Sequence, residues 1–144
     1  MKRLIISIIL AIALVLPPSG FSGDKQVQMS VTTVLSAVTV ALSTTQTSAA
    51  IDLAGVRGYF SIQYAITGDG TLTLSYTLSN DGTNYLLPSA DSTIATGLTK
   101  TSGPGGDGKD IISFNPSIAR FMKITATETG GTNAAVVTID CAIE

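Results

Sequence analysis

Residues 58–85 contain two runs of strict alternation, the clearest pattern in this chain. Apolar side chains occupy every second position of residues 60–66 and again of residues 72–78. A period of two is that of a β-strand with one buried face, as found in antiparallel sheets. Gly-Asp-Gly at 68–70 separates the two runs, and these residue types favour a tight turn. We therefore expect two neighbouring antiparallel strands here.

The same alternation recurs along the rest of the chain between clusters of Gly, Pro, Asn and Asp. No window has a sustained apolar period of 3.6 with caps, and the abundant Thr, Val and Ile favour strands. Further strands are predicted at residues 26–35, 37–42, 50–53, 93–99, 111–114, 120–127 and 134–143. Residues 101–110 are predicted to be a long flexible loop, because four glycines and a proline interrupt a ladder. Eight or nine short strands predict an all-β fold, a single antiparallel β-sandwich of jelly-roll type.

Residues 1–22 have the organisation of a cleaved N-terminal signal peptide. Two basic residues precede an apolar run over residues 4–16, two prolines end the run, and Gly20 and Ser22 fit a signal-peptidase site. The run is shorter than the ~20 residues of a comfortable membrane span. We expect cleavage after Ser22, secretion by a bacterial-type pathway to the periplasm or the cell exterior, and no stable membrane span afterwards. An uncleaved membrane anchor is the alternative.

The remaining chain is predicted to divide at residue 48. Residues 23–48 are an N-terminal β-strand segment that ends in a polar link, Ser-Thr-Thr-Gln-Thr-Ser, and residues 49–144 are the sandwich core. Val27, Met29 and Val31 share one face of the N-terminal strand. Such a strand can fill its own sheet or add to the exposed edge of a neighbouring subunit, so these residues are candidates for an assembly strand.

Composition excludes several kinds of chemistry. Histidine is absent and there is one cysteine, which excludes His-dependent nucleophiles and His or thiolate metal sites. Removal of residues 1–22 leaves six basic and ten acidic residues, a net charge of −4, and no basic footprint for nucleic acid. We therefore expect a non-enzymatic protein without a nucleic-acid partner. Cys141 alternates with three aliphatic residues, which predicts a buried, inert thiol; an intermolecular disulfide or a reactive thiol is the alternative.

Aspartates in glycine-rich turns are the candidates for a metal site. Asp81, Asp107 and Asp110 offer carboxylates next to loop carbonyls, which are the oxygens that calcium takes. Their spacing does not match an EF-hand, and turn aspartates commonly bond to their own backbone. We expect no cofactor, with calcium as the alternative.

Aromatic side chains are the candidates for ligand contact. Tyr59 points to the polar side of its strand, and Tyr85 follows an Asn-Asp-Gly turn beside Asn84. An exposed ring can stack on the apolar face of a pyranose while a nearby amide takes its hydroxyls. The other interpretation is that each ring packs under a loop.

Two segments carry a resemblance to a known family. The first reads Ser-Asn-Asp-Gly-Thr-Asn-Tyr at 79–85, and the second reads Pro-Ser-Ile-Ala-Arg-Phe-Met-Lys-Ile at 116–124. Both are similar to segments of the discoidin-like (coagulation factor 5/8 C-type) galactose-binding β-sandwich, over about half of the chain. The resemblance implies a jelly-roll sandwich and an adhesion-type role. Tyr85 stands where the family usually has tryptophan, and no ligand-binding residue is transferred.

Together these features predict a secreted structural or surface-assembly protein that associates with copies of itself through β-strand edges. A homo-oligomer or a filament is the expected form. The alternative is an extracellular carbohydrate-binding, lectin-like adhesion module, with a glycan or another surface polymer as its partner.

Overall fold

The computed structural model describes residues 29–89 and 91–144. The predicted signal peptide, its cleavage site and Val27 lie outside the described residues. The described part of the chain consists of strands and loops, and no helix in it could span a membrane. The strands are β1 (Ser30–Val40), β2 (Thr45–Thr47), β3 (Ile51–Asp52), β4 (Phe60–Gly68), β5 (Leu72–Ser79), β6 (Thr93–Leu98), β7 (Lys109–Phe114), β8 (Phe121–Glu128) and β9 (Ala135–Ile143).

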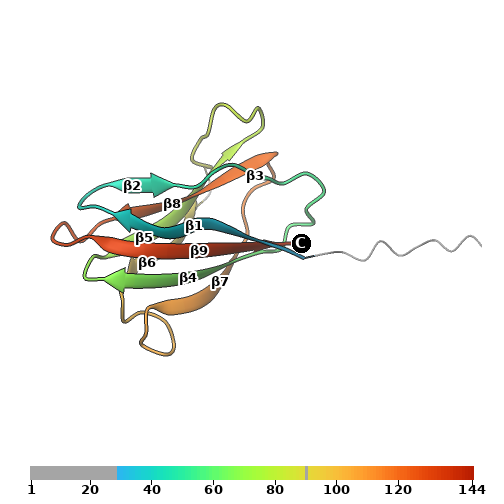
Figure 1. Cartoon of the computed structure of the whole chain (residues 1–144). Helices are drawn as coiled ribbons and strands as arrows, with labels where there is room; N and C mark the ends of the chain where they lie inside the picture. Colours follow the sequence, from blue (N-terminus) through green and yellow to red (C-terminus); the bar gives the residue numbers. More distant parts are fainter. Residues whose placement is uncertain (1–28, 90) are drawn as a thin grey trace, which may run out of the picture.

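The strands form two antiparallel sheets that pack face to face (Figure 1). One sheet has the order β1-β9-β4-β7, and the other has the order β2-β8-β5-β6, with β3 also paired to β8. With β2 and β3 taken as one interrupted strand, the first strand pairs with the last, the second with the seventh, the third with the sixth, and the fourth with the fifth. This nested pairing is a jelly roll, so the predicted all-β sandwich is confirmed.

The core lies where the alternation predicted it. The apolar faces of the long strands point between the sheets, and Cys141 shares this interior with Val137 and Ile139. Only 2% of Cys141 is exposed, and burial raises the pKa of its thiol to about 11, so the thiolate is scarce at neutral pH. The other fully enclosed side chains include, on β4, β5 and β8, Ile62, Tyr64, Ile66, Leu72, Leu74, Met122, Ile124 and Ala126.

The N-terminal segment is part of the sandwich. The two predicted strands at 26–35 and 37–42 are a single strand, β1, which pairs with β9 of its own sheet from Ser30 opposite Ile143 to Val40 opposite Ala135. The ladder is irregular between Thr33 and Val38, and Ala37 has a positive φ of 48°. A bulge of this kind lets one strand keep its pairing although the alternation of its inward and outward side chains shifts by one residue.

The predicted polar link at 43–48 contains a strand. Within it, β2 pairs with β8, and the Thr45 and Thr127 hydroxyls are 2.8 Å apart across the ladder. Thr-Gln-Thr has no apolar member, so hydrophobic periodicity could not reveal it. Residues 30–48 thus contribute strands to both sheets, and the division predicted after residue 48 does not separate them from the sandwich.

The loop between β6 and β7 is tightly folded. Ser102 N–H donates to the Thr99 carbonyl, Gly106 N–H to the Gly103 carbonyl and Gly108 N–H to the Ser102 carbonyl, at 2.9–3.1 Å. Gly108 has a φ of 75°, and a Cβ on it would lie 2.4 Å from the Ile66 carbonyl oxygen. The loop therefore needs glycine here for both its conformation and its close approach to β4.

Gly108→Ala is expected to lower the free energy of unfolding by about 3 kcal/mol or more, because alanine adds a backbone clash to the strain of a positive φ. Gly97→Ala is the matched control, since Gly97 also has a positive φ, of 69°, but open space around the position of a Cβ. That control should cost only about 1 kcal/mol. Denaturant titration measures both values, and equal losses would contradict the packing described here.

Candidate functional site

Exposed apolar side chains gather at one end of the sandwich. At this end, here called the apolar end, β4 begins and β5 and β9 finish, and β1 starts beside the described C-terminus (Figure 1). Exposed aliphatic and aromatic side chains of this kind are candidates for contact with another molecule. Those at or next to the apolar end are Met29, Val31, Tyr59, Leu86, Leu87 and Ile118.

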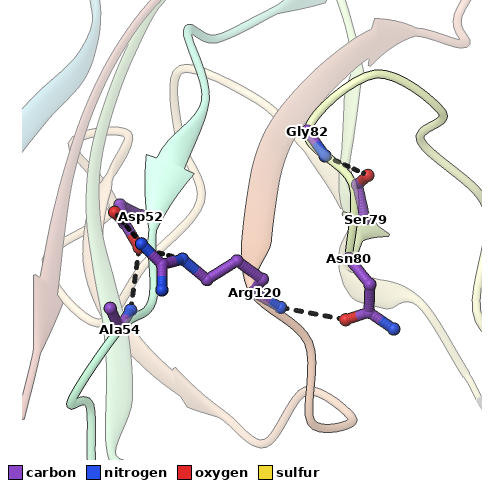
Figure 2. Close-up of polar contacts among 6 residues, drawn as sticks. All are labelled: Asp52, Ala54, Ser79, Asn80, Gly82 and Arg120. Atoms are coloured by element: carbon purple, nitrogen blue, oxygen red, sulfur yellow. Dashed lines mark hydrogen bonds and ion pairs between the residues drawn. The ribbon is translucent and has the colours of Figure 1, made fainter.

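The turn after β5 is built around one carboxylate. The Asp81 carboxylate accepts the Thr83 and Asn84 backbone N–H groups at 2.8 Å each, the Asn84 side-chain amide at 2.7 Å and the Ser79 hydroxyl at 2.8 Å. These donors, the Asn84 and Thr83 backbone groups above all, hold the pKa of Asp81 well below its usual range. Ser79 Oγ also accepts the Gly82 N–H (Figure 2). Asp81 is therefore committed to the turn.

Arg120 joins this turn to β3 (Figure 2). Its backbone N–H donates to Asn80 Oδ1 at 3.1 Å, and its guanidinium holds both carboxylate oxygens of Asp52 at 2.9 Å. The Ala54 N–H bond to Asp52 is the largest cause of the lowered pKa of that carboxyl, and Arg120 adds to it. Both partners are about half exposed, so the pair fixes the loops more than it stabilises the fold.

The two segments that carry the discoidin-like resemblance thus lie against each other. Besides the Asn80–Arg120 bond, a Cβ on Gly82 would lie 3.2 Å from the Phe121 ring, and Lys123 Nζ lies 4.0 Å from the centre of the Tyr85 ring. The contacts between the two segments account for the residue types at these positions as packing residues of the fold. The discoidin-like relationship stays a prediction.

The three candidate calcium ligands lie apart. Asp81 is at the apolar end, whereas Asp107 lies in the β6–β7 loop, 3.3 Å from Lys109 Nζ, and Asp110 accepts the Ile111 N–H at 2.8 Å. Among residues 29–89 and 91–144, no three Asp, Glu, His or Cys side chains are grouped so as to hold a metal ion. Calcium binding stays a prediction, and these three carboxylates do not form a site for it.

The candidate ligand contacts differ in their exposure. Tyr59 is 71% exposed and lines a shallow groove of about 470 Å³ with Ser61, Ser113 and Asn115. Tyr85 is half-buried beneath Lys123, and its hydroxyl is buried without a hydrogen-bond partner among the described residues. Asn84 is bonded to Asp81. Tyr59 precedes β4 in one sheet and Tyr85 follows β5 in the other, so the three do not form one site.

A second groove at the apolar end was not anticipated from the sequence. It has a volume of about 460 Å³ and is lined by the exposed Leu86, Leu87 and Ile118 together with the Ser79–Asp81 turn. The only sequence signal was the placing of apolar residues in two loops, Leu-Leu-Pro at 86–88 and Ser-Ile-Ala at 117–119.

The edge of β1 that faces away from β9 has no partner strand among the described strands. Only β9 pairs with β1 among the described strands, and the four residues from Ser30 to Thr33 are exposed on both faces. Natural edge strands are blunted by charges, proline, bulges or short length. β1 has eleven residues without a charge or a proline, and its irregularities begin only after Thr33. Its first half therefore presents an unprotected edge.

A buried carboxylate, which was not predicted from the sequence, bonds to three turns at the opposite end of the sandwich. Glu128 is 2% exposed and accepts backbone N–H groups from Ser43, Thr71, Gly130 and Gly131, which come from three separate turns. These bonds, the one from Ser43 most strongly, lower the pKa of Glu128. These donors are all backbone N–H groups of turns, which is the bonding of a structural carboxylate.

Comparison with known proteins identifies no family. No family description and no curated protein sequence matches this chain. Among solved structures, the chain is similar to one of the infectious bursal disease virus Gx strain, at 13% identity and a TM-score of 0.45, over 81% of this chain and 31% of that one. The VP2 subviral particle of the same virus gives 11% identity and a TM-score of 0.45, over 81% and 32%. The chain spans about a third of the length of these viral chains, and no function is inferred from them.

Glu128→Gln is expected to lower the thermal unfolding midpoint at pH 7, because an amide NH₂ would face backbone donors. The pKa of Glu128 is lowered in the folded state, so its contribution is present above its unfolded value of 4.5 and is lost as the pH falls through the folded value. The gap between variant and parent should therefore narrow from pH 7 to pH 2. Asp107→Asn, at an exposed ion pair, is the control and should change little. A gap that does not depend on pH would contradict this role.

Proposed function

We propose that this protein is a secreted, non-enzymatic structural protein that assembles with copies of itself through strand edges. The observation that carries the proposal is the unprotected edge of β1, where Val31 is 59% exposed although it lies within a regular ladder. Secretion is supported by the sequence of residues 1–22 alone.

The chemistry of the described residues favours a structural role. Carboxylates that could serve as acids or bases are engaged in turns, as at Asp81 and Glu128, or in exposed ion pairs, as at Asp69 with Lys100. Cys141 is enclosed in the core. The two grooves are lined mainly by aliphatic, aromatic, hydroxyl and amide side chains, and the one carboxylate in the second groove, Asp81, is held by the turn.

The energetics favour a weak contact that is repeated many times. Each added backbone hydrogen bond contributes about 1 kcal/mol net, and a cross-strand aliphatic pair adds up to about 1 kcal/mol. A strand-edge contact with four such hydrogen bonds and one aliphatic pair therefore contributes about 5 kcal/mol, and most of this free energy offsets the entropy lost on association. The protein should be a monomer when dilute and associate at high local concentration, as on a crowded surface.

Val31→Lys is expected to abolish concentration-dependent association, because it places a charge on the regular part of the edge. Thr39→Lys is the matched control, since Thr39 is exposed on the same strand beyond the bulge and should leave association intact. Sedimentation velocity over a wide range of protein concentration measures the mass of each form. A parent protein that stays monomeric throughout would refute the proposed function.

A second candidate function is carbohydrate binding at the Tyr59 groove. The exposed Tyr59 ring lies among hydroxyl and amide groups from Ser61, Ser113 and Asn115, the combination that suits a pyranose. This candidate needs neither Tyr85 nor Asn84.

If the groove binds sugar, Tyr59→Ala should weaken binding to any glycan retained on an array by roughly tenfold, through loss of the stacking face. Ile118→Ala, which removes an exposed side chain from the other groove, should leave glycan binding unchanged. Equal binding by the parent and by Tyr59→Ala would exclude this groove as the site.

A further inference from the structure

The sheet that contains β1 has a second free edge, formed by β7. In the order β1-β9-β4-β7 each strand is antiparallel to the next, so β1 and β7 run in opposite directions. Two copies set side by side in the same orientation therefore bring β7 of one copy antiparallel to β1 of the next. No strand has to leave its own domain for this.

The backbone groups at both edges can be assigned from the ladder. Ile66 N–H donates to the Gly108 carbonyl, and groups alternate along a strand, so Ile111 and Ser113 direct their N–H and C=O away from β4. Glu144 N–H donates to the Tyr59 carbonyl, and the same alternation carried through β9 directs those of Val31 and Thr33 away from the sheet. By the same alternation Lys109 is also directed away from β4, so β7 presents Lys109, Ile111 and Ser113 while β1 presents Val31 and Thr33. The Ile111 N–H donates to Asp110 Oδ1 at 2.8 Å within its own strand, so a partner strand takes the place of that carboxylate.

The side chains at these positions match. Val31 lies in register with Ala142, Ser61 and Ser113, and Ile111 lies in register with Gln63, Asp140 and Thr33, all on the outer face of the sheet. Ile111 is 64% exposed. Each free edge thus carries one exposed aliphatic side chain, on the same face and beside outward-directed backbone groups.

We propose that β1 of one copy pairs with β7 of the next, with Val31 opposite Ile111. This inference rests on the proposed function and names the partner surface within it. In this register Thr33 is opposite Lys109, where the pairing ends on both sides. The ladder of β1 becomes irregular after Thr33, and the β6–β7 loop brings Gly103 against the Lys109 carbonyl. The last regular residue of β1, Thr33, and the first accessible residue of β7, Lys109, are opposite each other only in this register.

The contact is heterologous, because it joins two different surfaces of the chain. Every copy keeps one free β1 edge and one free β7 edge, so addition continues at both ends of a growing assembly. Each copy adds four strands to a shared sheet, and neighbouring strands are rotated by about 20–25°. The assembly is therefore a twisted filament in which the sheet is continuous.

The test mixes two blocked variants. Val31→Lys blocks the β1 edge, and Ile111→Lys blocks the β7 edge, so each alone should be monomeric by sedimentation velocity. Their equimolar mixture should form a one-to-one heterodimer and stop there, because each supplies the edge that the other lacks. Gln63→Lys, at an exposed central position on the same face, is the control and should assemble as the parent does.

The outcomes separate this inference from the proposed function. A parent protein that never associates overturns both. A parent protein that associates, with Ile111→Lys still associating like the parent, overturns this inference alone; association through two β1 edges is one such case. Circular dichroism of each variant verifies folding. If lysine unfolds either strand, Val31→Cys and Ile111→Cys replace the pair: the mixture should yield a mixed disulfide under oxidation, and only self-linked dimers would overturn the inference.

Discussion

An open sheet of four strands leaves two edges whose backbone groups have no partner within it, and the properties of this molecule follow from where those edges fall. The buried faces of β4 and β9 fix their register, because a slip of one residue would turn every apolar side chain outward. β1 and β7 pair with these two central strands and form the edges of the sheet, so the fixed register also sets which of their backbone groups point outward. The unusual feature is that the β1 edge carries no charge or proline before its bulge.

Sequence periodicity predicted the central strands well and the peripheral ones poorly, for a physical reason. The runs at 60–66 and 72–78 alternate because one face is core and the other is wet, so pattern and burial coincide. β2 holds its place through backbone pairing and a threonine contact, neither of which leaves an apolar signal. The continuity of β1 depends on Ala37 adopting a positive φ, which its residue type does not reveal.

The candidate sites show the same division between local and distant determinants. The Asp81 turn could be predicted because its donors lie within three residues. Tyr85 is covered by Lys123, and Glu128 accepts hydrogen bonds from three turns. Both arrangements depend on partners far along the chain, so local sequence does not predict them. The sequence predicts that Val31 lies on an assembly strand. The structure shows that this strand pairs with β9 of its own sheet. Assembly would therefore use the free edge of the strand, and the strand itself would not be donated to a neighbour.

Amide hydrogen exchange at the two edges tests the central claim most directly. In dilute protein, the Val31 amide points away from the sheet and should exchange rapidly, and the Ile111 amide, held only by the Asp110 carboxylate of its own strand, should exchange faster than the amides inside the ladder. At concentrations where the mass rises, both should become protected together, while Tyr76, in the second sheet, donates to the Ser92 carbonyl at every concentration and should not change. A rise in mass without protection at Val31 and Ile111 would show that another surface forms the contact and would contradict the account.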